Sequence, residues 1–230
     1  VMELGGSDPF IVLEDADMDA AVNAAVRARY QNTGQSCIAA KRFIVATPVF
    51  RDFQDRFVEG VRGLKMGNPM DRATHVGPLA RPEFAKDLER QIQDSVRQGA
   101  VILLGGKRCE GTGYFFEPTV LTDVRPDMSV GCEEVFGPVA ALMRAKDTEE
   151  AIRLANQTPY GLGSSLWTSD LENAKRLARK IEAGQVFING IVASDPRLPF
   201  GGIKRSGYGR ELSELGIREF VNIQTVWISP

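Results

Sequence analysis

The amino-acid sequence predicts an α/β protein with a mostly parallel sheet that is flanked by helices. Short apolar runs recur along the chain, at 10–13, 101–104 and 186–188, and such runs are typical of strands buried on both faces. Amphipathic segments with helical spacing separate them, for example at 18–30 and 171–181. Buried strands that alternate with helices favour parallel pairing, with helices on both sides of the sheet.

The N-terminal part of the chain opens with the strand at 10–13, and Asp17 can cap the helix that follows. A second strand is expected at 42–45. Thr47 and Pro48 predict an N-cap followed by a proline in the first turn of the next helix. That helix carries large apolar side chains at helical spacing, which we expect in the core and not in a ligand site: Phe50, Phe53, Phe57 and Val61. The stretch 65–81 holds glycines and prolines and is predicted to be a loop.

The alternation continues after this loop. Pro82 starts a helix that Gly99 ends. A capping-box-like sequence that begins at Asp147 predicts the start of another helix. Strands are expected on either side of these helices and near the end of the chain, at 101–104, 119–121, 139–143, 166–167 and 186–188.

The C-terminal residues depart from this rhythm, because 221–228 alternate in the manner of a strand with no helix after it. An unpaired terminal strand that carries Trp227 needs cover. Two interpretations have similar weight. The segment adds to a sheet in another subunit or in another part of a longer chain, or it is an edge strand of the same sheet.

Composition limits the class of protein. The 230 residues carry a formal net charge of -2 and 43% hydrophobic residues, as in ordinary globular domains. There is no basic run and no apolar run of bilayer length, so neither nucleic acid nor a membrane is expected as a partner. Three cysteines and the single His75 form neither a disulfide framework nor a zinc site, and they favour a reducing, cytoplasmic compartment.

Cys37 lies on a short polar loop that starts at Asn32, between the predicted helix and the strand at 42–45. A cysteine thiolate is a strong nucleophile, and free backbone N–H groups in such a loop can stabilise an oxyanion. Taken alone, a single cysteine is better explained as a small buried apolar residue, as we expect for Cys109 and Cys132. The motifs that accompany Cys37 favour the nucleophile.

Three other stretches contain residues that could take part in an active site. Glu3-Leu4-Gly5-Gly6 places a carboxylate beside two glycines, which allow close approach of a backbone or a flat cofactor. Glu133 to Pro138 places a carboxylate and an aromatic ring before a Gly-Pro turn. Pro199 to Gly207 is a glycine-rich loop with one aromatic side chain. Each stretch alone is explained by a cap, a turn or a loop.

Together, and in this order, the four motifs closely resemble the aldehyde dehydrogenase superfamily. The resemblance covers the whole chain and corresponds to the family's C-terminal catalytic portion. Residues 1–218 would form the thiol-bearing catalytic domain without the N-terminal dinucleotide-binding half, and 219–230 the arm through which homo-oligomers form. The abrupt start at Val1 fits a chain that begins inside a longer protein. Within the family, residues 3–10 and 30–35 look most like bacterial succinate-semialdehyde dehydrogenases.

The resemblance implies a catalytic role for two residues. Cys37 would attack the aldehyde carbon to give a thiohemiacetal, and loss of hydride would leave a thioester. Glu3 would be the general base that activates water to hydrolyse this thioester.

The resemblance also implies a cofactor, NAD or NADP, and a small aldehyde as substrate. Glu134 would hold the nicotinamide ribose, with Phe136, Leu4 and Gly5 beside the cofactor. Phe200 would form part of the aromatic wall around the aldehyde.

The substrate position six residues before the nucleophile departs from the family pattern. Several succinate-semialdehyde enzymes have an arginine there, whereas this chain has Gln31, which can hydrogen-bond a carboxylate but cannot neutralise it. Ser194 and Arg197 are candidate substitutes, although a solvated loop charge explains Arg197 slightly better. Ala39 stands where some relatives carry a second, redox-active cysteine.

Two alternatives to a hydrolytic dehydrogenase remain open. A CoA-acylating relative would pass the acyl group to CoA, but that branch generally lacks the glutamate found here as Glu3. A non-catalytic fragment kept for assembly would not need Cys37, Glu3 and Glu134 together. The sequence contains no glycine-rich turn that feeds a helix in the manner of a dinucleotide-binding unit, so the chain by itself is expected to be inactive.

Overall fold

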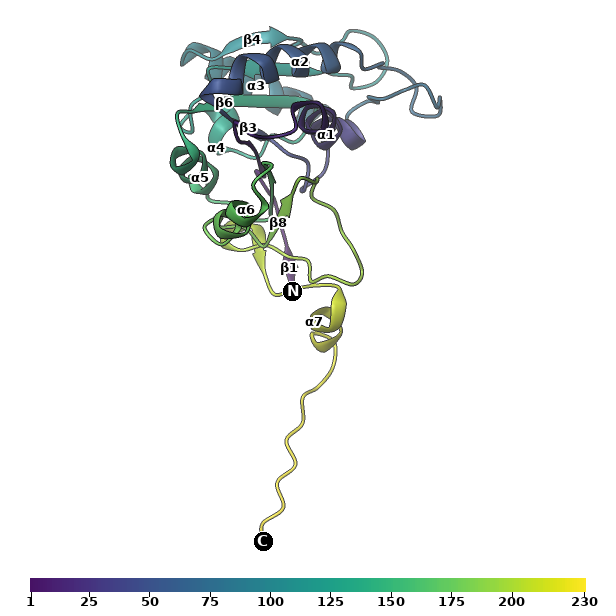
Figure 1. Ribbon diagram of the computed structural model, residues 1–230. Helices are drawn as coiled ribbons and strands as arrows, with labels where there is room; N and C mark the ends of the chain where they lie inside the picture. The colour runs from purple at the N-terminus through teal and green to yellow at the C-terminus, as the bar shows by residue number, and fades with distance from the viewer.

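A seven-stranded sheet forms the centre of the computed structural model, which describes residues 1–230 (Figure 1). The strand order is β4-β5-β6-β3-β2-β7-β8. All neighbouring pairs are parallel except β4 and β5, which confirms the predicted, mostly parallel sheet. The strands are β2 (Pro9–Val12), β3 (Arg42–Ala46), β4 (Val101–Leu104), β5 (Thr119–Thr122), β6 (Val139–Ala145), β7 (Gly163–Trp167) and β8 (Gln185–Ile188).

The antiparallel edge has a local cause. A glycine-rich turn region, without a helix, joins β4 to β5. A parallel pair needs a long crossover, usually through a helix, whereas an antiparallel pair does not.

Successive side chains of each strand enter two separate cores. Phe10 and Val12 of β2 face one core, together with α1 (Met18–Tyr30) and α2 (Phe50–Arg62). Ile11 and Leu13 face the other, which is covered by four helices: α3 (Pro82–Arg97), α4 (Ser129–Cys132), α5 (Thr148–Asn156) and α6 (Leu171–Ala178). The large apolar residues of α2 are buried in the first core, as predicted: Phe50, Phe53, Phe57 and Val61.

Most helix starts follow the sequence signals. The side chain of Asp17 accepts a hydrogen bond from the N–H of Ala20 at the start of α1. Asp147 does the same for the N–H of Glu150 at the start of α5. The prediction for Thr47 was wrong. Residues Thr47–Val49 form a separate 3-10 turn, and the Thr47 hydroxyl donates to the carbonyl of Ala145 on β6 and caps no helix.

A small second sheet lies beside the main one, where β1 (Met2–Glu3) pairs antiparallel with β9 (Gly207–Tyr208). A 3-10 turn, Lys204–Ser206, precedes β9, and the last helix is α7 (Ser213–Arg218). Neither β1, β9 nor α7 was predicted. No helix in the structure combines the length and the apolar character that crossing a membrane requires.

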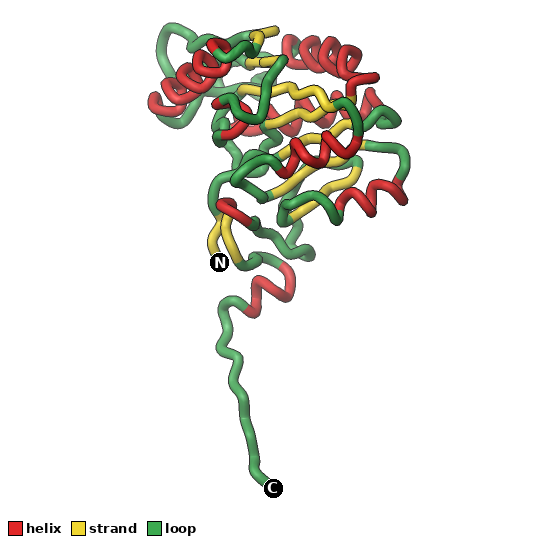
Figure 2. Tube along the Cα trace, turned by 90° about the vertical axis from the view of Figure 1, so that its left-hand side faces the viewer, coloured by secondary structure: helices red, strands yellow, loops and turns green.

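Residues 219–230 extend away from the body of the protein (Figures 1 and 2). They pair with no strand of this chain, so the segment is not an edge strand of the same sheet. Its apolar side chains are exposed, including Trp227 at 81%. The remaining interpretation, pairing with another chain or another part of a longer chain, stays a prediction.

Candidate active site

The loop before Cys37 reverses the chain through three consecutive residues in the left-handed region. The φ angles are 50° at Asn32, 58° at Thr33 and 71° at Gly34. Non-glycine residues adopt this conformation only where surrounding contacts fix it. The Thr33 hydroxyl exchanges hydrogen bonds with the backbone of Gly77, and buried Arg29 donates to the Gly34 carbonyl at 2.7 Å.

Cys37 is half-buried on the turn that follows, and is not sealed in an apolar core. Burial raises the pKa of its thiol, while the charge of Lys41 and a backbone hydrogen bond from Ile38 act in the opposite direction. Lys41 also donates hydrogen bonds to the carbonyls of Ser36 at 2.9 Å and Cys37 at 2.6 Å. The thiol therefore sits on a fixed backbone beside a buried cation.

Gly5 and Gly6 allow their segment of backbone to pack closely against the Cys37 loop and against Glu134. A β-carbon at Gly6 would lie 2.7 Å from the Cys37 carbonyl oxygen, and one at Gly5 would overlap the Glu134 carboxylate. The N–H of Gly6 donates to Glu134 Oε1 at 3.0 Å. Absence of side chains at both glycines thus lets the backbone contact Cys37 and Glu134 at once. Leu4, in the same segment, is largely exposed.

Glu3 lies at the end of β1, where β9 pairs with it. Its Oε1 atom is buried and has no hydrogen-bond partner. Burial raises the pKa of Glu3, the neighbouring carboxylate of Glu211 raises it further, and Arg210 partly offsets both. A half-buried carboxylate with a free oxygen and a raised pKa has the properties of a general base.

Glu134 and Phe136 line a pocket of about 310 Å³ together with side chains of α3 and Tyr160. The Phe136 ring meets that of Phe84 edge to face, with centroids 5.4 Å apart. Gln91 donates to the Glu134 backbone carbonyl at 3.1 Å. The Glu134 carboxylate at the glycine backbone and the adjacent Phe136 ring thus line the same pocket.

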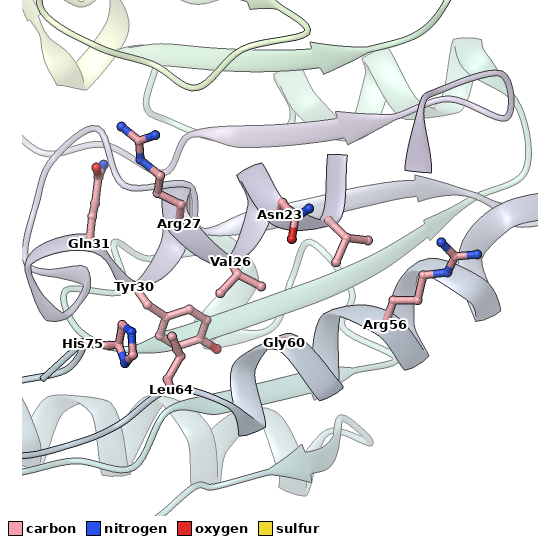
Figure 3. Close-up of a pocket in the computed structure, with 10 residues that line it drawn as sticks. Asn23, Val26, Arg27, Tyr30, Gln31, Arg56, Gly60, Leu64 and His75 are labelled. Atoms are coloured by element: carbon pink, nitrogen blue, oxygen red, sulfur yellow. The ribbon is translucent and has the colours of Figure 1, made fainter. Parts of the chain in front are cut away.

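The predicted substrate residues do not converge on one pocket of this chain. Gln31 lines a pocket of about 410 Å³ between α1 and α2, where its side chain rises beside that of Arg27 (Figure 3). Phe200 is buried and lines another pocket beside β8. Ser194 is exposed. The left-handed turn that begins at Asn32 reverses the chain between Gln31 and Cys37.

Arg197 is exposed and forms an ion pair with Asp195, with 2.6 Å between the nearest nitrogen and oxygen. Its charge is therefore already paired with a carboxylate of the same loop, which weakens it as a substitute for the missing arginine.

Sequence reasoning missed three ionisable residues of this region, Asp8, Lys41 and Glu211. Asp8 and Lys41 are buried, and Asp8 accepts a hydrogen bond from the N–H of Gly163. One signal was available, because Lys41 and Arg42 are two adjacent cations at the start of an apolar strand. Glu211 gave no signal, since only the folded chain brings it to Glu3.

Comparison with known proteins identifies the family of the chain. Residues 1–226 match the aldehyde dehydrogenase family, and the chain belongs to that family. A succinate-semialdehyde dehydrogenase [NADP(+)] of Mycobacterium avium is 57% identical over 228 residues, which is 99% of this chain and 48% of that protein.

Solved structures share the fold. A succinate-semialdehyde dehydrogenase from Burkholderia pseudomallei superposes with a TM-score of 0.92 at 44% identity, covering 96% of this chain and 46% of that one. Lactaldehyde dehydrogenase from Escherichia coli superposes with a TM-score of 0.95 at 36% identity, covering 98% and 48%. The chain spans about half the length of these relatives.

Proposed function

We propose that the protein carrying this chain oxidises an aldehyde to the carboxylic acid with NAD(P)+, with Cys37 as nucleophile and Glu3 as general base. One observation carries the proposal: the four-residue segment that contacts the Cys37 loop also holds a carboxylate with a buried, unpartnered oxygen. No protein group donates to that oxygen, and the charge of Glu3 acts on the Cys37 thiol. Among the alternatives, a CoA-acylating enzyme has no need for such a base.

The residues divide the reaction into two steps. The Cys37 thiolate attacks the aldehyde carbon, and the resulting oxyanion is stabilised by the backbone N–H of Cys37. Bound NAD(P)+ supplies the hydride acceptor, and a thioester remains on Cys37. Glu3 then takes a proton from water as the water oxygen attacks the thioester carbon, and the Cys37 thiolate leaves.

The cofactor and the aldehyde are proposed from the site and from the relatives' names. Glu134 and Phe136 would hold the nicotinamide end, with Gly5 and Leu4 alongside. The relatives at 56–57% identity are named succinate-semialdehyde dehydrogenases that use NADP+. We therefore propose succinate semialdehyde and NADP+ as the pair to test first, with Phe200, Gln31 and Ser194 as substrate residues.

The test compares the intact protein with its Cys37→Ser variant, on succinate semialdehyde with NADP+ or NAD+ and with or without CoA. We expect succinate as product whether or not CoA is present, and a loss of activity by several orders of magnitude in the variant, because serine lacks comparable activation. A product that becomes succinyl-CoA when CoA is added would establish the acylating alternative. Substantial activity in Cys37→Ser would identify another nucleophile.

The exposed apolar segment 219–230 supports homo-oligomer formation, because a strand-like stretch with exposed Phe220, Ile223 and Trp227 is stabilised when another chain covers it. Light scattering should show a lower mass for the intact protein without this segment. A cytoplasmic location is consistent with three unpaired cysteines.

A further inference from the structure

Lys41 is one of three fully buried cations, with Arg29 and Arg42, and it is the one that contacts both Cys37 and Glu134. It lies between the Cys37 turn and the first residue of β3. A buried ammonium group loses its hydration, so it persists only where polar partners replace water. The partners of Lys41 therefore indicate what the residue does.

The partners come from two motifs that are far apart in the sequence. The Lys41 ammonium donates to the carbonyls of Ser36 at 2.9 Å and Cys37 at 2.6 Å. It also lies 4.0 Å from Glu134 Oε1, the oxygen that accepts the N–H of Gly6 at 3.0 Å. One cation thus contacts both the backbone of the candidate nucleophile and the candidate cofactor-binding carboxylate.

Asp8 supplies a further charge to this cluster. Its carboxylate is buried, and its Oδ2 atom has no hydrogen-bond partner. Burial is the main influence on both groups, raising the pKa of Asp8 and lowering that of Lys41, whereas their mutual attraction opposes each shift. Arg29 repels the Lys41 charge from the α1 side.

We propose that Lys41 is a positioning residue: its buried ammonium group fixes the Cys37 turn and orients the Glu134 carboxylate, so that nucleophile and cofactor-binding group are held by one side chain. The proposal deepens the function proposed above and rests on it for the role of Glu134. A neutral hydrogen-bond donor could hold the two carbonyls, but only a cation also attracts Glu134 and favours the Cys37 thiolate.

The first test measures the thiol directly in the intact protein, without aldehyde or nucleotide. Cys37 is alkylated with iodoacetamide across a pH series, and the rate at this residue is read by peptide mass spectrometry, separately from Cys109 and Cys132. We expect Lys41→Met to slow alkylation about tenfold near neutral pH, as for a thiol pKa raised by about one unit. Four other charged groups face this cluster and are not substituted in Lys41→Met: Asp8, Glu134, Glu3 and Arg29.

Two further variants make the result decisive. Lys146→Met removes a lysine whose side chain is 75% exposed, and it should leave the alkylation profile unchanged. Asp8→Asn combined with Lys41→Met removes the carboxylate that the single variant leaves unpaired, so that a folded protein can be measured if Lys41→Met alone does not fold. Because Asp8 itself raises the pKa of Cys37, the double variant is compared with Asp8→Asn alone. A pH profile that does not shift in folded Lys41→Met, or in the double variant relative to Asp8→Asn, would overturn the coupling to Cys37, whereas a purely structural lysine would change only the thermal stability.

The second test is a double-mutant cycle on NADP+ affinity in the intact protein, with Lys41→Met and Glu134→Gln. We expect each variant to raise Kd about fivefold or more. The pair should raise it no further than the larger single effect, because Lys41 acts through Glu134. Effects that multiply would overturn the positioning role. The alkylation test does not depend on turnover, so the two proposals can fail separately. If the intact protein oxidises no aldehyde, the proposed function is contradicted. A shifted alkylation profile in Lys41→Met would still support the contact between Lys41 and Cys37.

Discussion

Gly34 packs against the carbonyl group of Gly137, so closely that a β-carbon at Gly34 would overlap that oxygen and would also approach Arg29. Gly34 belongs to the turn that presents Cys37. Gly137 directly follows the aromatic residue of the motif that carries Glu134. The contact therefore fixes the candidate nucleophile relative to the candidate cofactor-binding carboxylate, although 102 residues lie between Gly34 and Gly137 in the sequence.

Gly34→Ala should destabilise the protein by roughly 2–5 kcal/mol, through left-handed backbone strain together with the overlap. Gly111→Ala is the matched control. Gly111 also has a positive φ, 108°, but its β-carbon would meet nothing within 4 Å, so only the strain remains, about 1–2 kcal/mol. Denaturant unfolding measures both. Equal losses for the two variants would show that the contact with Gly137 adds nothing to stability.

Glu3→Gln separates the two chemical steps, since it removes the base but keeps the thiol. In the intact protein we expect a burst of reduced nucleotide of about one equivalent per active site, followed by very slow turnover. Intact-mass measurement should detect the acyl group on the protein, and digestion should place it on Cys37. A variant that turns over at the wild-type rate, or that gives no burst, would contradict the division of roles between Cys37 and Glu3.

The acidic side of the pH–rate profile should report Glu3. As a base it acts only when ionised, so activity is lost as the pH falls through its pKa, which burial and then Glu211 raise above the ordinary 4.5. Glu211→Gln removes the second influence, and the acidic limb should move to lower pH. Glu214→Gln is the control, because Glu214 pairs with Arg218 on α7 and does not act on Glu3. A limb that stays in place in Glu211→Gln would assign the titration to another group.

The sheet could be predicted because each strand carries its own signal. Residues 10–13 and 139–143 are uninterrupted apolar runs, and Asp17 and Asp147 mark helix starts by local hydrogen bonds that depend on neighbouring residues alone. Thr47 carries the same local signal, yet tertiary structure overrides it, because β6 offers its hydroxyl a carbonyl partner. β1 and β9 have only two residues each, too few for any periodicity.

The sequence motifs contain the candidate site residues, but they gave no indication of the buried charges around them. Cys37, Glu3 and Glu134 lie in recognisable stretches. Lys41 and Asp8 appear in the sequence as ordinary charged residues, and only the fold shows that both are buried together beneath the cysteine turn. Gln31 shows the opposite limit. The family resemblance named it as a substrate residue, and in this chain it lines a pocket between α1 and α2, so its role stays a prediction.

The last prediction concerns nucleotide binding by the 230-residue chain alone. Tight dinucleotide binding in α/β proteins uses a strand, a glycine-rich turn and the start of a helix. The glycine-rich stretch 199–209 instead contains the 3-10 turn Lys204–Ser206 and β9, and α7 has only six residues. Glu134 and Phe136 can contact the nicotinamide end, but the structure offers no such unit for the pyrophosphate.

Calorimetry on this chain should therefore give a Kd for NAD+ and NADP+ weaker than about 1 mM, a binding free energy of roughly -4 kcal/mol at best. An activity assay should detect no aldehyde oxidation. A cooperative unfolding transition in the same preparation shows that the chain is folded, and the intact protein serves as the positive control. Micromolar binding or catalytic turnover by this chain would show that its own residues complete the cofactor site.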